Sequence, residues 1–503
     1  MKKGNVSIFL ALLFPLVLAL LLTLLESARY GGIRLQAESA GNAAVDSVMA
    51  GYNRTLLDRY GLLFYDGGKG TGLISFEDLE EEFTEYFRRN MPEGSGSLFK
   101  STLSEVKTAD LVTATDYNGE VFIRSALDFY KFGAAADLLS ELEDQASELK
   151  EGEAALNRAN GDKSTLQDTD WGGNASPEGS LGTVSFMRQI RFMDGEDDGG
   201  FDDDRLKQDL ADSPIGKTDE EKAKGFLALV VPSDRQVSVY TADLAEAPSK
   251  ISVDPRETTG SDVLEDALRK VMFNEYVLSQ FTCFTDDPDK NGFRYQTEYV
   301  LFGNASDEQN LKSAVNRIMW MREGMNLVHI LSSDKWSAVE DLATVLFAWT
   351  ENPVIIELAA MAMAAAWAYG EAVLDMRALL HGKKVAFVKT DDTWTLSLEG
   401  LTDMDWESGI EAKSSESGMN YEGYLRLMLY LNNVHAVAYK TMDLVQDDVR
   451  QKYPGFYMAA QIYAVEFKAA MKAAPLFSAL PAAFGFFGSG FRYEWEERFS
   501  EVY

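Results

Sequence analysis

Cysteine and histidine are almost missing from this chain of 503 residues. The single cysteine, Cys283, excludes an intrachain disulfide. The three histidines, His329, His381 and His435, have no partner at the spacing that metal ligands require. The sequence also lacks a glycine-rich phosphate loop, a nucleophile elbow and a Cys–His arrangement. We therefore do not expect an enzyme.

Positive charge is also scarce. Lys and Arg number 47 against 80 Asp and Glu, which gives a formal net charge of −33. Such a surface repels phosphate backbones, so nucleic acid is not an expected partner. Hydrophobic residues make up 46% of the chain, which is enough for a large folded core.

The run of residues 6–25 contains no charged side chain. As a helix it extends roughly 30 Å, the thickness of a bilayer's hydrocarbon core. A cleaved signal peptide and a buried core helix are the alternatives. Signal peptides have a shorter apolar core of about 7–15 residues, and Glu26-Ser27-Ala28 is a poor cleavage site. The run therefore predicts an uncleaved transmembrane anchor.

The charges before this run predict its orientation. Lys2 and Lys3 lie in the short tail of residues 1–5 and favour the cytoplasmic side. We expect a single-pass protein of the cytoplasmic membrane, with its N-terminus inside and its large domain outside the cell.

A second helical pattern continues over residues 26–66. Its apolar residues recur at steps of three and four, as on one face of a helix. Near the membrane this stripe consists of Ile33, Ala37, Ala40, Ala44 and Val48. A helix that begins in the membrane and runs on into an exported domain is the design of pilin-like proteins.

Several short segments at the N-terminus resemble the start of TadE/TadG-like pseudopilins, which are single-span proteins of the tight-adherence (Tad, or Flp) pilus apparatus. They are Gly4-Asn5-Val6-Ser7, Pro15, Glu26-Ser27-Ala28-Arg29 and Leu35-Gln36-Ala37-Glu38. One position departs from the pilin pattern. Pilin prepeptides carry Glu five residues after the cleaved Gly, and counting from Gly4 that position is Phe9. Prepilin-peptidase processing is therefore not expected.

The whole chain also resembles a Gram-positive family of unknown function that occurs beside Tad-type secretion and pilus genes. The later matching segments are residues 298–303 (EYVLFG), 322–326 (REGMN), 367–371 (WAYGE) and 394–398 (WTLSL). The resemblance supplies no catalytic residue. It implies a structural component of a Tad/Flp-type pilus or secretion assembly, with other pseudopilin-like or pilus-assembly subunits as partners.

The small residues of the stripe suggest where such a partner binds. Ala37, Ala40 and Ala44 let two helix backbones approach closely, so we expect them to contact the helix of another subunit. The alternative is that they face a thin part of their own domain.

The remaining sequence predicts an α+β exported domain that is rich in helix in its second half. Residues 67–156 form its first part with a helical arm, residues 157–225 a flexible acidic insertion, and residues 226–503 the main domain. Helices are expected over 261–281, 306–331, 353–381 and 421–452. Strands are expected over 226–231, 236–240, 293–302, 385–398, 456–470 and 491–503.

One segment matches the calcium-loop pattern D-x-[DN]-x-[DN]-G-x5-E. Asp287, Asp289, Asn291 and Glu298 supply oxygen ligands at its first, third, fifth and twelfth positions, with Gly292 at the turn. A calcium loop of this kind needs a following helix, whereas residues 293–302 resemble a strand, and the same residues form an ordinary turn without metal. Calcium is therefore the one cofactor considered. It suggests an alternative function, an anchored extracellular adhesion or ligand-binding domain.

Overall fold

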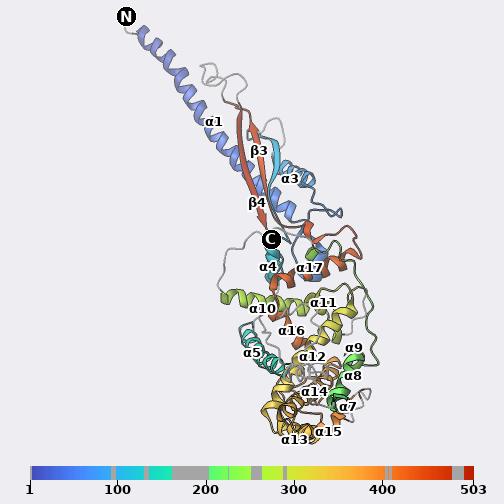
Figure 1. The fold of residues 1–503 in the computed structure, drawn as a ribbon. Coiled ribbons are helices and arrows are strands. Elements are labelled where there is room, and N and C mark those ends of the chain that lie inside the picture. The colour runs from blue at the N-terminus through green and yellow to red at the C-terminus, as the bar shows by residue number, and fades with distance from the viewer. Residues whose placement is uncertain are drawn as a thin grey trace. The chain divides into compact units, whose positions relative to one another are not determined.

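A computed structural model describes residues 3–91, 98–129, 135–160, 203–224, 226–250, 263–286, 292–402, 406, 410–477 and 492–503. The fold is α+β, as predicted, and divides into two compact units. Unit 1 is formed, within these residues, by 3–129 and 448–503 (Figure 1). Unit 2 is formed by the chain between them.

Unit 1 begins with the helix α1 (Lys3–Met49). The predicted helix over 26–66 does not continue to its end. After Met49 the chain turns into the short helix α2 (Arg54–Tyr60) and the strand β1 (Tyr65–Asp66). The Asn53 side chain starts α2 by accepting hydrogen bonds from the backbone N–H groups of Thr55 and Leu56.

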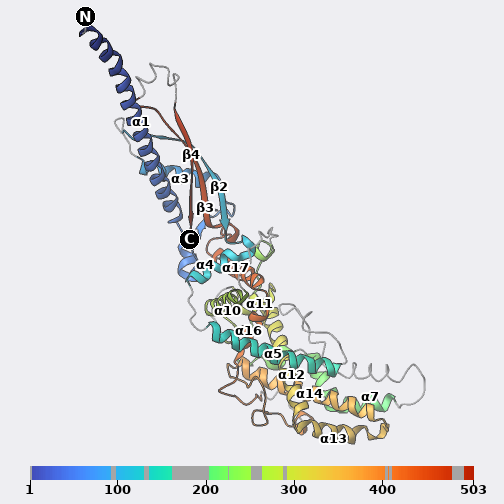
Figure 2. The same cartoon turned by 90° about the vertical axis from the view of Figure 1, so that its left-hand side faces the viewer.

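An antiparallel sheet completes unit 1. Its central strand β3 (Gln461–Ala473) pairs with β2 (Thr102–Thr113), β4 (Tyr493–Val502) and β1. The helices α1 and α3 (Phe76–Asn90) pack on the sheet through a shared apolar core, and α4 (Glu120–Phe129) follows β2 (Figure 2). The structure confirms strands in the predicted ranges 456–470 and 491–503. Aromatic and branched residues alternate there with charged ones, a pattern that favours strands.

Unit 2 is helical. Its helices are α5 (Ala135–Asn160), α7 (Asp203–Asp212), α8 (Pro214–Lys224), α9 (Phe226–Val230), α10 (Val263–Gln280), α11 (Gln296–Phe302), α12 (Asp307–Ser332), α13 (Lys335–Phe347), α14 (Pro353–Leu380), α15 (Leu398–Thr402), α16 (Tyr421–Leu431) and α17 (Val434–Arg450), whose last residues belong to unit 1. The helices α5, α12 and α13 pack around α14. Asn352 caps α14 through the N–H of Val354, and Pro353 occupies its first turn.

Several predicted strands of unit 2 are wrong. Residues 226–230 and 296–302 form the helices α9 and α11, and residues 236–240 and 385–398 form no strand. All seven residues of α11 are buried. Their aromatic and branched composition therefore reflects burial on every side, which periodicity alone cannot distinguish from a strand.

The structure describes only part of the predicted acidic insertion. Residues 203–224 form α7 and α8 rather than a flexible segment, while residues 161–202 lie outside the described part. In these helices Leu206, Leu210 and Ile215 are buried, so apolar burial outweighs the high local charge.

Two described helices are long and apolar enough to cross a membrane, α14 and α1 from Phe9 onward. In α14 the most apolar window is 67% buried, which confirms the prediction of a core helix. In α1 the corresponding window is only 6% buried. The chain therefore has an N-terminal apolar helix whose first part is uncovered.

Candidate functional site

The most unusual feature of unit 2 is a group of charged side chains inside its helical core. Glu371 and Asp375 lie one turn apart on α14, and Arg322 and Asn326 lie one turn apart on α12. Lys389 comes from the loop that follows α14. The side chains of all four charged residues are 0% exposed. We call these five residues the buried charge network.

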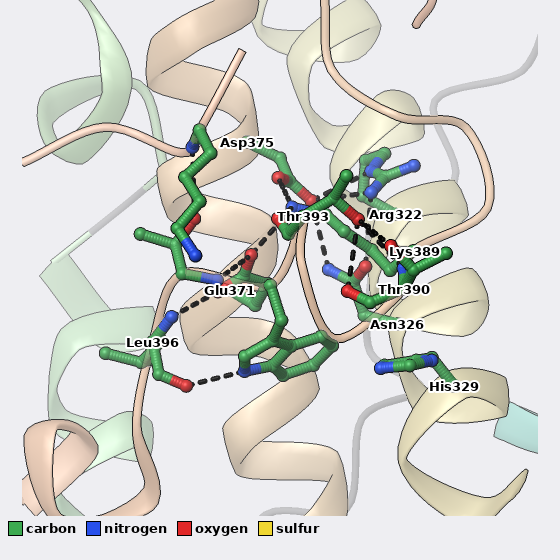
Figure 3. A network of polar contacts seen from close by, with 12 residues as sticks. Arg322, Asn326, His329, Glu371, Asp375, Lys389, Thr390, Thr393 and Leu396 are labelled. Atoms are coloured by element: carbon green, nitrogen blue, oxygen red, sulfur yellow. Dashed lines mark hydrogen bonds and ion pairs between the residues drawn. The ribbon is translucent and has the colours of Figure 1, made fainter. Parts of the chain in front are cut away.

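Each charge in the network has an opposite partner (Figure 3). The Arg322 guanidinium donates two hydrogen bonds to Oδ2 of Asp375, at 2.9 and 2.8 Å. The Lys389 Nζ lies 2.7 Å from Oε1 of Glu371 and 2.7 Å from Oδ1 of Asp375. Asn326 donates to the same Asp375 oxygen at 3.1 Å. Two cations therefore balance two carboxylates.

The surroundings perturb the two carboxyl groups in opposite directions. Burial raises the pKa of Glu371, and the negative charge of the neighbouring Asp375 raises it further. The positive charge of Lys389 acts in the opposite direction. Burial also acts to raise the pKa of Asp375, but the two adjacent cations outweigh it and lower that pKa. Asp375 is thus the anionic centre of the network, because it alone contacts both cations.

The network fixes the loop that carries residues 389–398. The Glu371 carboxylate accepts hydrogen bonds from the backbone N–H of Thr395 (3.1 Å) and of Leu396 (2.7 Å). The indole nitrogens of Trp367 and Trp394 both donate to the carbonyl oxygen of Leu396, at 2.9 and 2.5 Å. The loop is therefore held by side chains and not by a strand ladder, which explains why the predicted strands are absent.

A groove lies beside this loop. Its volume is about 880 Å³, and more of its lining is apolar than polar. It is lined by Lys335, Ala338, Asp341, Leu342, Val345, Trp367, Trp394, Thr395, Leu396, Ser397, Leu398 and Glu399. Because Arg322, Asp375, Glu371 and Lys389 do not line it, the groove gains no charged group from the network.

The histidine nearest the groove is His329 on α12. Its ring packs against Trp394, with 5.3 Å between centroids, and its Nε2 lies 3.4 Å from Asp391. Burial and the nearby Lys335 lower its pKa, so the ring is neutral near pH 7. Among the residues that the structure describes, no three His, Cys, Asp or Glu side chains are grouped to hold a metal ion.

Three members of the predicted calcium loop, Asp287, Asp289 and Asn291, lie outside the described residues. The fourth, Glu298, is on α11 and is fully buried. Its Oε1 accepts hydrogen bonds from the Phe284 N–H and the Tyr421 hydroxyl, both at 2.9 Å. Burial raises the pKa of Glu298 to about 7. Calcium binding at this loop stays a prediction.

The predicted assembly stripe lies in the interior of unit 1. Its members are each at most 3% exposed: Ile33, Ala37, Ala40, Ala44 and Val48. The last four belong to the apolar core shared with the sheet and α3. The stripe therefore has a partner within the chain, which is the alternative that the sequence left open.

Sequence reasoning missed the buried charge network, because its members are far apart in the chain. One signal was present. Glu371 and Asp375 stand four residues apart in the apolar, mostly buried helix α14, where a charge requires a buried partner. Nothing in the sequence identified Arg322 and Lys389 as those partners.

These features define a mostly helical α+β protein with an N-terminal apolar helix and a charged interior. The chain belongs to a family of unknown function (DUF5702), whose sequence profile matches residues 205–473, more than half of its length. No curated protein and no solved structure matches it. The matched range contains the four later segments quoted above, and three of them supply Arg322, Trp367, Glu371 and Trp394 to the network and its loop.

Proposed function

We propose that this chain is a single-pass protein of the cytoplasmic membrane of a Gram-positive cell. Its N-terminus is cytoplasmic, its large domain is extracellular, and it acts structurally in a Tad/Flp-type pilus or secretion assembly. The division of α1 into two parts is the observation that supports this best. Eleven large apolar side chains between Phe9 and Leu25 are 39–71% exposed, whereas Ile33 to Val48 form a buried stripe.

The uncovered part of α1 requires an apolar environment. Soluble proteins rarely leave a continuous apolar surface of this size in water. A bilayer supplies such an environment over about 20 helical residues, which is the length of the uncharged run 6–25. The positive charges of Lys2 and Lys3 favour a cytoplasmic N-terminus.

The residues after the apolar part also support an uncleaved anchor. Glu26 pairs with Arg29 at 2.7 Å and accepts hydrogen bonds from the backbone N–H groups of Leu476 (3.0 Å) and Phe477 (2.7 Å). Cleavage after Ala28, the site closest to a signal-peptidase pattern, would remove Glu26 from unit 1. The anchor and the folded unit are thus one continuous element.

The assembly role is tested by crosslinking in membranes of cells that build the pilus. Leu35 is 68% exposed on α1, and Ala40, one and a half turns further, is 3% exposed. We expect a cysteine at Leu35 to crosslink to another subunit and a cysteine at Ala40 to give no product. The native Cys283 is buried, so we expect it to form no crosslink.

Two outcomes contradict the proposal. Full protection of the large domain when protease is added to intact protoplasts would overturn the topology. Normal pilus formation in cells that lack the chain, with no crosslink at Leu35, would overturn the assembly role.

A second candidate function, an extracellular adhesion or ligand-binding domain, is favoured by the groove of unit 2. Val345 lines this groove and is 77% exposed, so Val345→Asp changes the groove with little effect on folding. Under this alternative the variant loses cell adhesion while pilus assembly is unchanged. Under the assembly proposal the isolated wild-type protein does not adhere to cells.

A further inference from the structure

At the end of unit 1 nearest the apolar part of α1, Glu26 and Arg29 of this helix bind described residues that precede β2 and follow β3. Glu26 binds the backbone of Leu476 and Phe477, as described above. Arg29 donates from Nε to the carbonyl oxygen of Leu98 (2.5 Å) and from Nη1 to that of Ala474 (3.1 Å). The Glu26–Arg29 ion pair thus holds these residues against the first turn of α1 beyond Leu25. Glu26 is 4% exposed and Arg29 is 8% exposed.

Large apolar side chains are exposed here. Leu98 is 52% exposed, Phe99 40% and Leu476 52%. The ring of Phe99 lies against the helix backbone at Gly32, where a Cβ would come within 2.4 Å of it. We call Leu98, Phe99 and Leu476 the apolar collar.

We propose that the apolar collar inserts into the headgroup layer of the bilayer, so that unit 1 rests directly on the membrane surface. This inference depends on the proposed membrane anchor. The position of the collar along the axis of α1 supports this inference. From Leu25, the last residue of the apolar part, to Arg29 the helix rises about 6 Å. The headgroup region on each side of the hydrocarbon core is about 5–8 Å thick.

The surrounding residues suit a membrane interface. Tyr30 packs on Tyr493 at 4.6 Å and edge-on against Trp495 at 5.6 Å between ring centroids. Tyr and Trp are enriched at this depth because their rings combine an apolar body with a polar group. Lys100 and Arg492, both exposed, lie next to the collar and the aromatic group in sequence. Their positive charges suit contact with anionic lipid headgroups, in a chain whose net charge is −33.

The described residues that follow β3 agree with this assignment. Residues 474–477 contain no charged side chain. The burial of Glu26 and Arg29 has the same consequence. Their charges are paired with each other and with backbone groups, so the turn that leaves the hydrocarbon exposes no ion to it.

Fluorescence quenching in the full-length protein tests the inference. The protein is reconstituted in vesicles of phosphatidylcholine and phosphatidylglycerol, and single cysteines at Leu98 and Leu476 carry an environment-sensitive dye. Cys283 stays in place, because it is buried and burial raises the pKa of its thiol. We expect lipids with a shallow spin label to quench both dyes, and lipids with a deep spin label to leave them bright.

Two control positions separate this inference from the proposed anchor. Leu16 is 66% exposed in the apolar part of α1, and a dye there reports on the anchor through the deep label. Leu73 is 78% exposed and follows β1, which pairs with the first residues of β3. It therefore lies about 40 Å, the length of β3, from the collar end of the sheet, and its dye stays bright.

Quenching at Leu16 without shallow quenching at Leu98 and Leu476 would overturn the collar and leave the anchor standing. An unquenched dye at Leu16 would overturn the anchor, and the collar with it. Equal shallow quenching at Leu73 and Leu98 would show that the label lacks depth selectivity for the collar, which also overturns the inference.

Discussion

Charged side chains are placed differently on the sheet of unit 1 and in the helical core of unit 2. On the sheet they pair across neighbouring strands, as in Lys468–Glu496 at 2.7 Å, whose side chains are 41% and 60% exposed. In the core of unit 2 the charges of Arg322 and Asp375 meet at 2.8 Å with no exposure. The same kind of ion pair thus has a different role in the two places. An exposed pair changes stability by at most about 1 kcal/mol, whereas a buried charge that loses its partner costs about 3–5 kcal/mol.

The largest effect is expected from Asp375→Asn. The change removes the carboxylate that pairs with Arg322 and leaves Lys389 with Glu371, so unit 2 should lose about 3–5 kcal/mol of unfolding free energy. Hydrogen exchange followed peptide by peptide across a urea series measures each unit separately. Lys468→Ala is the matched surface variant, and its expected loss in unit 1 is below about 1 kcal/mol. Equal losses in the two variants would remove the contrast between the units.

Glu298 tests what happens to a buried carboxylate without a cation. Its pKa is about 7 in the folded chain against an ordinary value of 4.5, so the folded state holds a proton that the unfolded state releases between these values. Its contribution to stability is therefore complete below about pH 4.5 and is lost as the pH rises through about 7. The loss reaches about 3 kcal/mol.

Glu298→Gln keeps this site neutral at every pH. The variant should match the wild type near pH 4.5 and be more stable by about 3 kcal/mol at pH 8. Thermal unfolding at a series of pH values measures the difference. A difference that does not change with pH would show that Glu298 is not the titrating group.

The smallest effect concerns packing in unit 1. A Cβ at Gly41 of α1 would lie 2.2 Å from the Phe499 ring, whereas one at Gly31 would meet nothing within 4 Å. Gly41→Ala should therefore destabilise unit 1 by about 1–2 kcal/mol through overpacking. Gly31→Ala should stabilise it by about 0.5–1 kcal/mol, because Ala favours a helix. Urea unfolding followed by exchange in β3 and β4 distinguishes the two signs.

These contrasts also show which features the sequence could predict. Helices with caps or long periodic patterns, such as α12 and α14, were predicted close to their observed bounds, and so was the alternating strand β4. Local patterns contain that information. The strand predicted over 293–302 was wrong because full burial of α11 removes the periodic signal. The buried charge network depends on contacts across more than fifty residues, as between Arg322 and Asp375, which no local pattern specifies.

The order of strands in unit 1 has a consequence for biosynthesis. The central strand β3 begins at Gln461, so the sheet cannot close until the whole of unit 2 has left the ribosome. While the intervening chain is translated, the inner face of α1 has no complete sheet to pack against. The alanines Ala37, Ala40 and Ala44 in the middle of this face keep its exposed apolar area small during this interval, which limits premature association with other nascent chains. Unit 1, although its helix α1 precedes unit 2 in the chain, is completed after unit 2.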